Sequence, residues 1–485
     1  MPRKRDSHAA RRRLNIPPLA YVITAFVLAR ITCFILGVRF DIEPLDYYWQ
    51  FIDPQLLRTN LFESLYYLHS QPPLFNLFLG IVLKLLPGHE ALAFHVIFLA
   101  FGLTLSISLY LLMTSLGLSG RLSSILTIIF VASPSCVLYE DFLFYTYPIA
   151  TALCLSALLL HRYLKFGRFR HLAIFFALLA SLVLTRSVFH LAWFVTLALP
   201  LIWYQRKNWK KIALAAGIPF LLCFLLYAKN AHEFGSFSSS TWFGMNFARL
   251  TTWRLPLSER YNLIAQGKIS TLSLVKPFRK LETYQRHSHV PLAEPTGIPV
   301  LDQTQKSTEA PNLNNLTYIN ISRQYWRDAL YVLPRYPGTY IGSLFESLLI
   351  YFIPTSSYSF LKDNRDKIGI VDRAYNLILC GQLQYEKEIT DDRAFLNTGL
   401  LTALGYLVVI VYGFLLLKQA FKRRSMSSPY ALTLLFIWLN LVYVTIVGNA
   451  FELGENNRFR FVVDPFFLVL LGLALKHRFK KPATK

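Results

Sequence analysis

Residues 429–450 read PYALTLLFIWLNLVYVTIVGNA, a run of 22 residues without a charged side chain. A helix of this length covers roughly 33 Å, enough to cross a hydrocarbon core about 30 Å thick. Nine further apolar runs lie at 17–38, 92–116, 122–138, 147–164, 171–187, 188–204, 212–228, 397–417 and 461–476. The pattern predicts an all-α polytopic integral membrane protein with about 10–13 transmembrane helices, interfacial helices and a long outer loop.

The composition excludes an ordinary soluble enzyme. Of the 485 residues, 54% are hydrophobic and only 16% are charged, whereas soluble domains carry about 25% charge. Five cysteines are scattered without a CxxC spacing, which indicates neither a disulfide framework nor a zinc site.

The basic residues predict the orientation of the chain in the membrane. Lys and Arg number 50 against 27 acids, giving a net charge of +23. Many of them gather in short segments at the N-terminus, 161–171, 204–211, 418–424 and 477–485. Because cytoplasmic loops are rich in Lys and Arg, we place all five segments in the cytoplasm and expect no nucleic-acid partner. That placement leaves the apolar segments 74–86 and 337–354 interfacial or re-entrant.

In this arrangement only one carboxylate, Asp6, falls on the cytoplasmic side. Two causes would explain why the acids lie on the outer side. One is a reaction site on the outer face, and the other is that the inner loops are basic and leave the acids no other place. Three regions follow: a membrane module with the first outer loop (39–91) over 1–228, an outer insertion with an interfacial helix over 229–396, and C-terminal membrane helices over 397–485.

The first outer loop places four acids among aromatic residues directly after the first span. Asp41, Glu43, Asp46 and Asp53 accompany Tyr47, Tyr48, Trp49 and Phe51. A carboxylate beside aromatic rings at a membrane surface loses hydration, so its pKa rises toward a value useful for accepting a proton. The alternatives are solvated loop acids and an aromatic belt at the membrane interface.

Four motifs in order along the chain resemble the GT-C glycosyltransferases, most closely the protein O-mannosyltransferase and lipid A aminoarabinose transferase branch. They are the acidic first loop with HSQPPL (69–74), SPSCVLYEDFLFYTYP (133–148), TRSVFH (185–190) and GENNRFRFVVDPFFLVLL (454–471). The long insertion has no counterpart in this resemblance. Asp46-Tyr47 also stands where relatives often have Asp-Glu, so a second carboxylate is missing or comes from elsewhere.

The resemblance implies transfer of a sugar from a polyprenyl-phosphate donor to a glycan, lipid or protein acceptor on the extracytoplasmic face, with inversion. By position, Asp46 would be the general base, with Asp41, Glu43 and Asp53 as competitors. The acceptor hydroxyl is a weak nucleophile, and a carboxylate that takes its proton contributes about 10² to 10⁴ in rate.

The leaving phosphate needs cations at the outer membrane edge. We expect Arg458, Arg186 and Arg460 to bind it, with Arg458 favoured over Arg460 because the two face different sides of a helix. Lys229 and His190 are further candidates after Arg186. The alternative is that these arginines reach lipid headgroups or pair with Glu452 and Glu455.

Glu140, Asp141, His69 and Glu455 are the candidates for positioning the acceptor. We expect no metal, since one adjacent acidic pair is not a site, and no other cofactor. Arg30, inside the first span, should face the helix bundle or reach outward. The family branch suggests the bacterial inner membrane, with the active site facing the periplasm. A transporter or flippase of lipid-linked sugars is the alternative function, and a non-catalytic assembly factor is a third.

Overall fold

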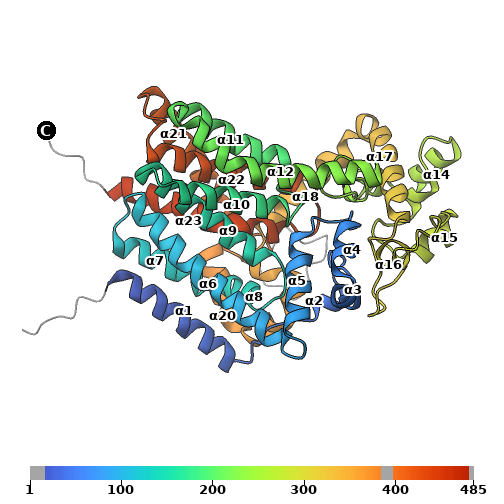
Figure 1. Ribbon diagram of the computed structural model, residues 1–485, viewed down its shortest axis with the longest axis horizontal. Helices are drawn as coiled ribbons and strands as arrows, with labels where there is room; N and C mark the ends of the chain where they lie inside the picture. The colour runs from blue at the N-terminus through green and yellow to red at the C-terminus, as the bar shows by residue number, and fades with distance from the viewer. Residues whose placement is uncertain (1–16, 384–396, 480–485) are drawn as a thin grey trace, which may run out of the picture.

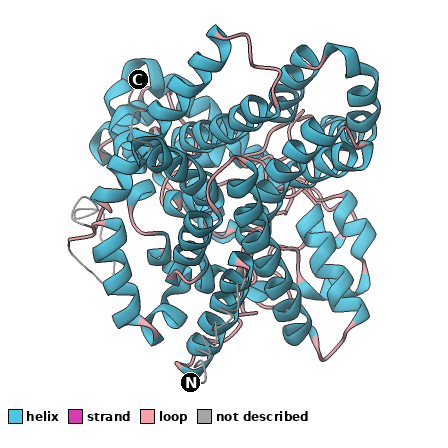
Figure 2. Cartoon of the chain, turned by 90° about the vertical axis from the view of Figure 1, so that its left-hand side faces the viewer, coloured by secondary structure: helices cyan, strands magenta, loops and turns pink. Residues whose placement is uncertain are grey.

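The computed structural model of the protein describes residues 17–383 and 397–479, and these residues form helices with no β-strand beyond isolated bridges. Figure 1 shows long helices side by side at one end of the molecule and a smaller group of helices at the other. The view in Figure 2, turned by 90°, shows the same all-helical packing. The prediction of an all-α membrane fold is confirmed.

The long-helix bundle consists of α1 (Pro18–Ile35), α6 (Glu90–Ser115), α7 (Gly120–Val131), α8 (Pro134–Glu140), α9 (Thr146–Phe166), α10 (Phe169–Val183), α11 (Leu191–Tyr204), α12 (Trp209–Phe234), α18 (Pro337–Phe352), α21 (Leu400–Lys422), α22 (Pro429–Ala450) and α23 (Asn456–Phe479). The remaining α-helices are α2 (Pro44–Tyr47), α3 (Pro54–Thr59), α4 (Leu61–Tyr66), α5 (Leu74–Leu85), α13 (Phe243–Leu250), α14 (Leu257–Ala265), α15 (Leu281–Ser288), α16 (Pro299–Asp302), α17 (Thr317–Arg335), α19 (Lys362–Lys367) and α20 (Gly369–Tyr375).

Ser-Pro pairs fix two of the helix starts. At α22 the Ser428 hydroxyl accepts a hydrogen bond from the backbone of Ala431, and at α8 the Ser133 hydroxyl accepts one from Cys136. In both helices proline occupies the first turn, where its missing N–H costs nothing. The second of these starts follows α7 so closely that α7 and α8 form a span bent by 59°.

Each of the ten predicted spans corresponds to a helix or to this bent pair. Among the described residues, however, only six helices, or seven spans with the bent pair, are long and apolar enough to cross a membrane by length and composition. Three of the ten predicted spans therefore do not meet the test. Helices α10 and α11 are too short, with 15 and 14 residues, and α23 carries the charged residues Arg458, Arg460 and Asp464.

The two segments predicted not to span are short helices. Segment 74–86 forms α5, with 12 residues, and segment 337–354 forms α18, with 16 residues. The three-region division stays a prediction. Its boundary at 228/229 falls inside α12, which continues without a break to Phe234.

Segments predicted to lie in the cytoplasm come together at one end of the bundle. The Gln205 amide donates to the Ser427 carbonyl at 3.0 Å, and the Ser427 hydroxyl donates to the Tyr204 carbonyl at 3.1 Å. These bonds join the loop before α12 to the loop before α22. In Figure 1 the first residues of α1 and the last of α23 lie at the bundle end opposite α14–α17.

Arg30 faces the bundle, where it forms a buried ion pair with Glu140. Its Nε and Nη2 donate to the two carboxylate oxygens at 2.8 and 2.9 Å, and the Tyr147 hydroxyl donates to the same carboxylate at 2.8 Å. Gly102 makes room for it, because a Cβ atom there would lie 1.8 Å from Glu140 Oε2. The pair fixes α1 against the bent span.

We predict that Arg30→Met destabilises the protein by about 3–5 kcal/mol, because it leaves a buried carboxylate without its cation. The double variant Arg30→Met/Glu140→Gln should be more stable than Arg30→Met alone. Equilibrium unfolding in mixed micelles measures both effects. A double variant at least as unstable as the single one would show that the pair does not act as a unit.

Candidate functional site

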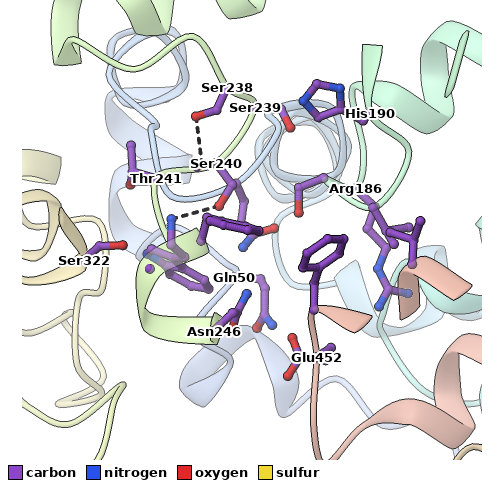
Figure 3. Close-up of a pocket in the computed structure, with 18 of the residues that line it drawn as sticks. Gln50, Arg186, His190, Ser238, Ser239, Ser240, Thr241, Asn246, Ser322 and Glu452 are labelled. Atoms are coloured by element: carbon purple, nitrogen blue, oxygen red, sulfur yellow. Dashed lines mark hydrogen bonds between the residues drawn. The ribbon is translucent and has the colours of Figure 1, made fainter. Parts of the chain in front are cut away.

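A cavity of about 700 Å³ opens where the outer segments of the chain meet. Its wall takes residues from the first and second outer loops, the turn between α10 and α11, the long insertion and the loop before α23. Figure 3 shows Gln50, Arg186, His190, Asn246 and Glu452 around it. Segments separated by some 400 residues therefore form one site.

Two arginines line the deep end of the cavity. Arg458 is 2% exposed and Arg186 is 5% exposed. The Arg458 guanidinium lies 4.6 Å from the centre of the Phe144 ring, and that of Arg186 lies 3.9 Å from the Phe459 ring. Arg458 Nη2 pairs with Glu455, but its Nε and Nη1 have no hydrogen-bond partner. Within the described chain, Arg186 contacts aromatic rings and makes no ion pair.

Two carboxylates at this end differ in their pKa values. Burial raises the pKa of Glu452, although Arg249 lies 2.9 Å from it. For Glu455 burial also acts upward, but Arg458, Arg249 and Arg186 outweigh it and lower the pKa. Burial, followed by repulsion from Arg458, lowers the pKa of Arg186 to about 10, so this side chain is still charged at neutral pH.

From the arginines the cavity continues along the surfaces of α11 and α22. Val188, Ala192, Thr196, Tyr443 and Val447 line this apolar part. Thr196 also lines a second hollow of about 920 Å³, whose other wall residues include Leu199, Pro200, Trp203, Leu435 and Leu439. Together the two hollows form a mainly apolar path along these membrane helices.

The hydroxyl-rich stretch SFSSST (236–241) forms another part of the wall and was not among the residues predicted from the sequence. The Ser240 hydroxyl donates to the Ser70 carbonyl at 2.6 Å, and Thr241 contacts His69, so the stretch is fixed to the first outer loop. Its composition was a usable signal, since hydroxyls in a row beside Trp242 are typical of a polar binding surface.

Some of the predicted residues lie at the cavity and others do not. Arg458, Arg186, Glu455 and His190 line it. Arg460 points elsewhere: its Nη1 donates to the Tyr351 carbonyl at 2.9 Å, and its Nε lies 3.6 Å from Asp464. The expected difference between Arg458 and Arg460 is therefore present in the structure.

Asp46 is exposed and does not line the cavity. Its backbone carbonyl accepts a hydrogen bond from Thr308 at 2.6 Å. The nearby Tyr48 connects this region to the cavity, because its hydroxyl contacts the Tyr358 hydroxyl, which donates to Glu455 at 3.1 Å. Asp46 and Arg458 thus do not share this cavity, and the role of Asp46 as base stays a prediction.

The competing acids also lie outside the cavity. Asp53 caps α3 and accepts hydrogen bonds from the backbone and hydroxyl of Ser307 at 2.7 and 2.5 Å. Asp41 bridges to the second outer loop, where its N–H donates to the Asp141 carbonyl, and burial raises its pKa to about 6. Glu43 is exposed.

Of the four residues expected to position an acceptor, Glu455 lines the cavity and the other three make structural contacts. Glu140 is buried with Arg30, and Asp141 lies 3.3 Å from His95. His69 is fully buried: its Nε2 donates to the Asn314 carbonyl and its Nδ1 accepts from Thr241, both at 2.8 Å. Lys229, which was expected to support Arg186 at the phosphate, instead donates to two backbone carbonyls, those of Tyr66 and Leu68.

No family model and no curated protein matches the chain. Among solved structures, the oligosaccharyltransferase of Archaeoglobus fulgidus is similar in its apo form, with a TM-score of 0.42 and 13% identity over 94% of this chain and 50% of that one. The same enzyme tethered with an acceptor peptide containing the NVT sequon gives a TM-score of 0.41 and 14% identity over 94% and 49%.

ArnT from Cupriavidus metallidurans in the apo state is also similar, with a TM-score of 0.33 and 12% identity over 93% of this chain and 76% of that one. The chain spans about half the length of the oligosaccharyltransferase. The likeness concerns the outline of the fold, and no residue role is carried over from it.

Burial lowers the pKa of His69 to about 3, so the folded protein keeps this ring neutral where the unfolded chain protonates it near 6.5. Its contribution to stability is therefore complete above pH 6.5 and is lost as the pH falls toward 3. We predict that wild type loses about 2 kcal/mol more than His69→Gln between pH 7.5 and pH 5. Unfolding of both proteins in mixed micelles tests this, and equal losses would contradict it.

Proposed function

We propose that the protein is a membrane glycosyltransferase that takes a sugar from a lipid-phosphate donor at this cavity. The observation that carries the proposal is Arg458, whose buried guanidinium has two nitrogens without partners beside a second buried arginine. A buried donor without a partner costs about 1–3 kcal/mol. A phosphate that accepts from both nitrogens would remove this cost.

The apolar path along α11 and α22 supports a donor that enters from the lipid phase. It begins beside Arg186 and continues past Thr196 to Leu435 and Leu439. A polyprenyl chain placed there would keep its phosphate at the arginines and its hydrocarbon among apolar side chains. A water-soluble nucleotide-sugar donor has no hydrocarbon chain that such a path would accommodate.

In the proposed reaction an acceptor oxygen attacks the anomeric carbon of the donor sugar. The bond from that carbon to the phosphate oxygen breaks, and polyprenyl phosphate leaves with the electron pair. Arg458 and Arg186 stabilise the charge that develops on the leaving oxygen. A single displacement of this kind inverts the anomeric carbon.

The acceptor's proton needs a carboxylate within hydrogen-bond reach. We assign this role to Glu452, because it lines the cavity and its pKa is raised by burial. Glu455 is held ionised by three arginines and is the weaker base. Asp46 remains the alternative, since catalytic contacts can form only once substrate is bound.

We further propose that the reaction takes place on the extracytoplasmic face of a bacterial inner membrane and without a metal. The basic inner segments favour this orientation, because the cavity lies at the opposite end from the loops before α12 and α22.

Arg458→Met should lower the release of polyprenyl phosphate by at least about 10²-fold, since it removes the cation that stabilises the leaving group. The assay uses protein in lipid vesicles and a panel of polyprenyl-phosphate-linked sugars. Arg58→Met is the matched control, because Arg58 is an outer arginine paired with Glu90 away from the cavity. Release by Arg458→Met at the wild-type rate would refute the proposal, and movement of intact donor without cleavage would instead indicate a flippase.

Glu452→Gln and Asp46→Asn identify the base. If Glu452 accepts the proton, its variant should lose about 10²-fold or more in turnover while donor binding is retained, and Asp46→Asn should stay within a few-fold of wild type. The reverse result would assign the role to Asp46 and would require the first outer loop to move toward the cavity during the reaction.

A further inference from the structure

We infer that the outer rim of the cavity is a subsite for a sugar ring, formed by three side-chain amides and an aromatic platform. The three amides belong to Gln50, Gln71 and Asn246, and the platform consists of Trp49 and Phe278. The inference rests on the proposed function, and it adds which chemical group the rim recognises.

The amides line the cavity without hydrogen-bond partners of their own. Gln71 is 9% exposed, and Gln50 and Asn246 are half-buried. Gln50 Oε1 is buried and unpartnered, and no side-chain hydrogen bond joins any of the three amides to a residue that the structure describes. Figure 3 shows Gln50 and Asn246 at the cavity. Buried polar groups are normally paired, so the unpartnered Gln50 Oε1, with two further amides open to the same cavity, indicates a ligand that supplies the partners.

A flat aromatic surface stands beside these amides. The Trp49 and Phe278 rings stack with centroids 5.5 Å apart and planes at 13°, and Phe278 packs edge-on against Trp242 at 5.4 Å. Trp49 remains 41% exposed. Phe278 has a φ of 64°, which is unfavourable for a bulky residue and is typical of functional sites.

These groups suit a sugar better than a peptide or a lipid. A sugar hydroxyl both donates and accepts hydrogen bonds, as a side-chain amide does, and the C–H face of the ring packs on an indole. An extended peptide usually adds to a strand edge, and the cavity contains none among the described residues. An acyl chain would need apolar walls, but three of the five side chains of the rim are amides, and Asn246 belongs to the insertion helix α13.

Two sugars could occupy the rim: the one carried by the donor, or the terminal ring of a glycan acceptor. Arg458 and Arg186 are nearly inaccessible, whereas Trp49 is exposed, so the rim lies outward from the phosphate end. Both possibilities predict that the rim recognises the sugar ring itself. Separate assays of donor cleavage and of transfer distinguish the two sources.

Binding can be tested without any reaction. Saturation-transfer NMR on the full chain in nanodiscs uses the methyl glycosides of mannose, glucose, galactose, arabinose and N-acetylglucosamine as probes. We expect at least one to bind, and Trp49→Ala and the pair Gln71→Leu/Asn246→Leu each to weaken that binding by roughly 3- to 10-fold. Tyr261→Ala and Gln266→Leu are matched controls, since both residues are exposed in the insertion and lie outside the cavity wall.

The same variants are then assayed with lipid-linked donors. Loss of donor cleavage to water identifies the donor's sugar as the occupant, and loss of transfer alone identifies the acceptor's; either result supports the subsite. If no glycoside binds, or if the rim variants bind like the controls, the inference is overturned. Glycoside binding that survives in Arg458→Met, in a protein that cleaves no lipid donor, would refute the proposed transferase while leaving the sugar subsite intact.

Discussion

A guanidinium group buried among aromatic rings is stable only if charge and hydrogen bonds compensate for its lost hydration. For Arg458 the charge is compensated, but the hydrogen bonding is incomplete. The rings of Phe144 and Tyr358 and the carboxylate of Glu455 stabilise the charge, and two nitrogens stay unpaired. The rest of the site follows from this incomplete pairing, because it leaves a buried, fixed cation directed at a cavity.

The surrounding fold keeps this arrangement in place. Arg458, Arg249 and Arg186 lower the pKa of Glu455 and keep it ionised, which maintains its pair with Arg458. Deeper in the bundle, Arg30–Glu140 and Arg460–Asp464 are paired within the protein rather than exposed to lipid. Charges inside a membrane protein are costly. Here the Arg30–Glu140 pair joins α1 to α8 and the Arg460–Asp464 pair lies within α23, while Arg458 keeps free donors for a ligand.

The polar and apolar parts of the cavity suit the two ends of one amphipathic substrate. Cations lie between an apolar path along α11 and α22 and a rim of amides, hydroxyls and indole. A lipid phosphate that carries a sugar has its three parts in the same order: hydrocarbon, phosphate and sugar. This correspondence, more than any single residue, links the proposed reaction to the proposed rim subsite.

The sequence by itself determined the membrane helices, because twenty apolar residues in a row carry their own reason to be helical and buried in lipid. The sequence also favoured Arg458 over Arg460 as the phosphate-binding arginine, because helical periodicity sets which side chains share a face. It placed Arg186 at the outer end of a helix as well. Only the tertiary structure decided which outer residues meet. From the sequence, Asp46 was predicted as the base and Glu452 only as a possible partner of the arginines. In the structure α2 packs against the insertion with Asp46 exposed, and the loop before α23 carries Glu452 into the cavity. Gln50, Gln71 and Asn246 are unremarkable polar residues until the first outer loop and the insertion bring their amides to one cavity, and no local pattern encodes that long-range packing.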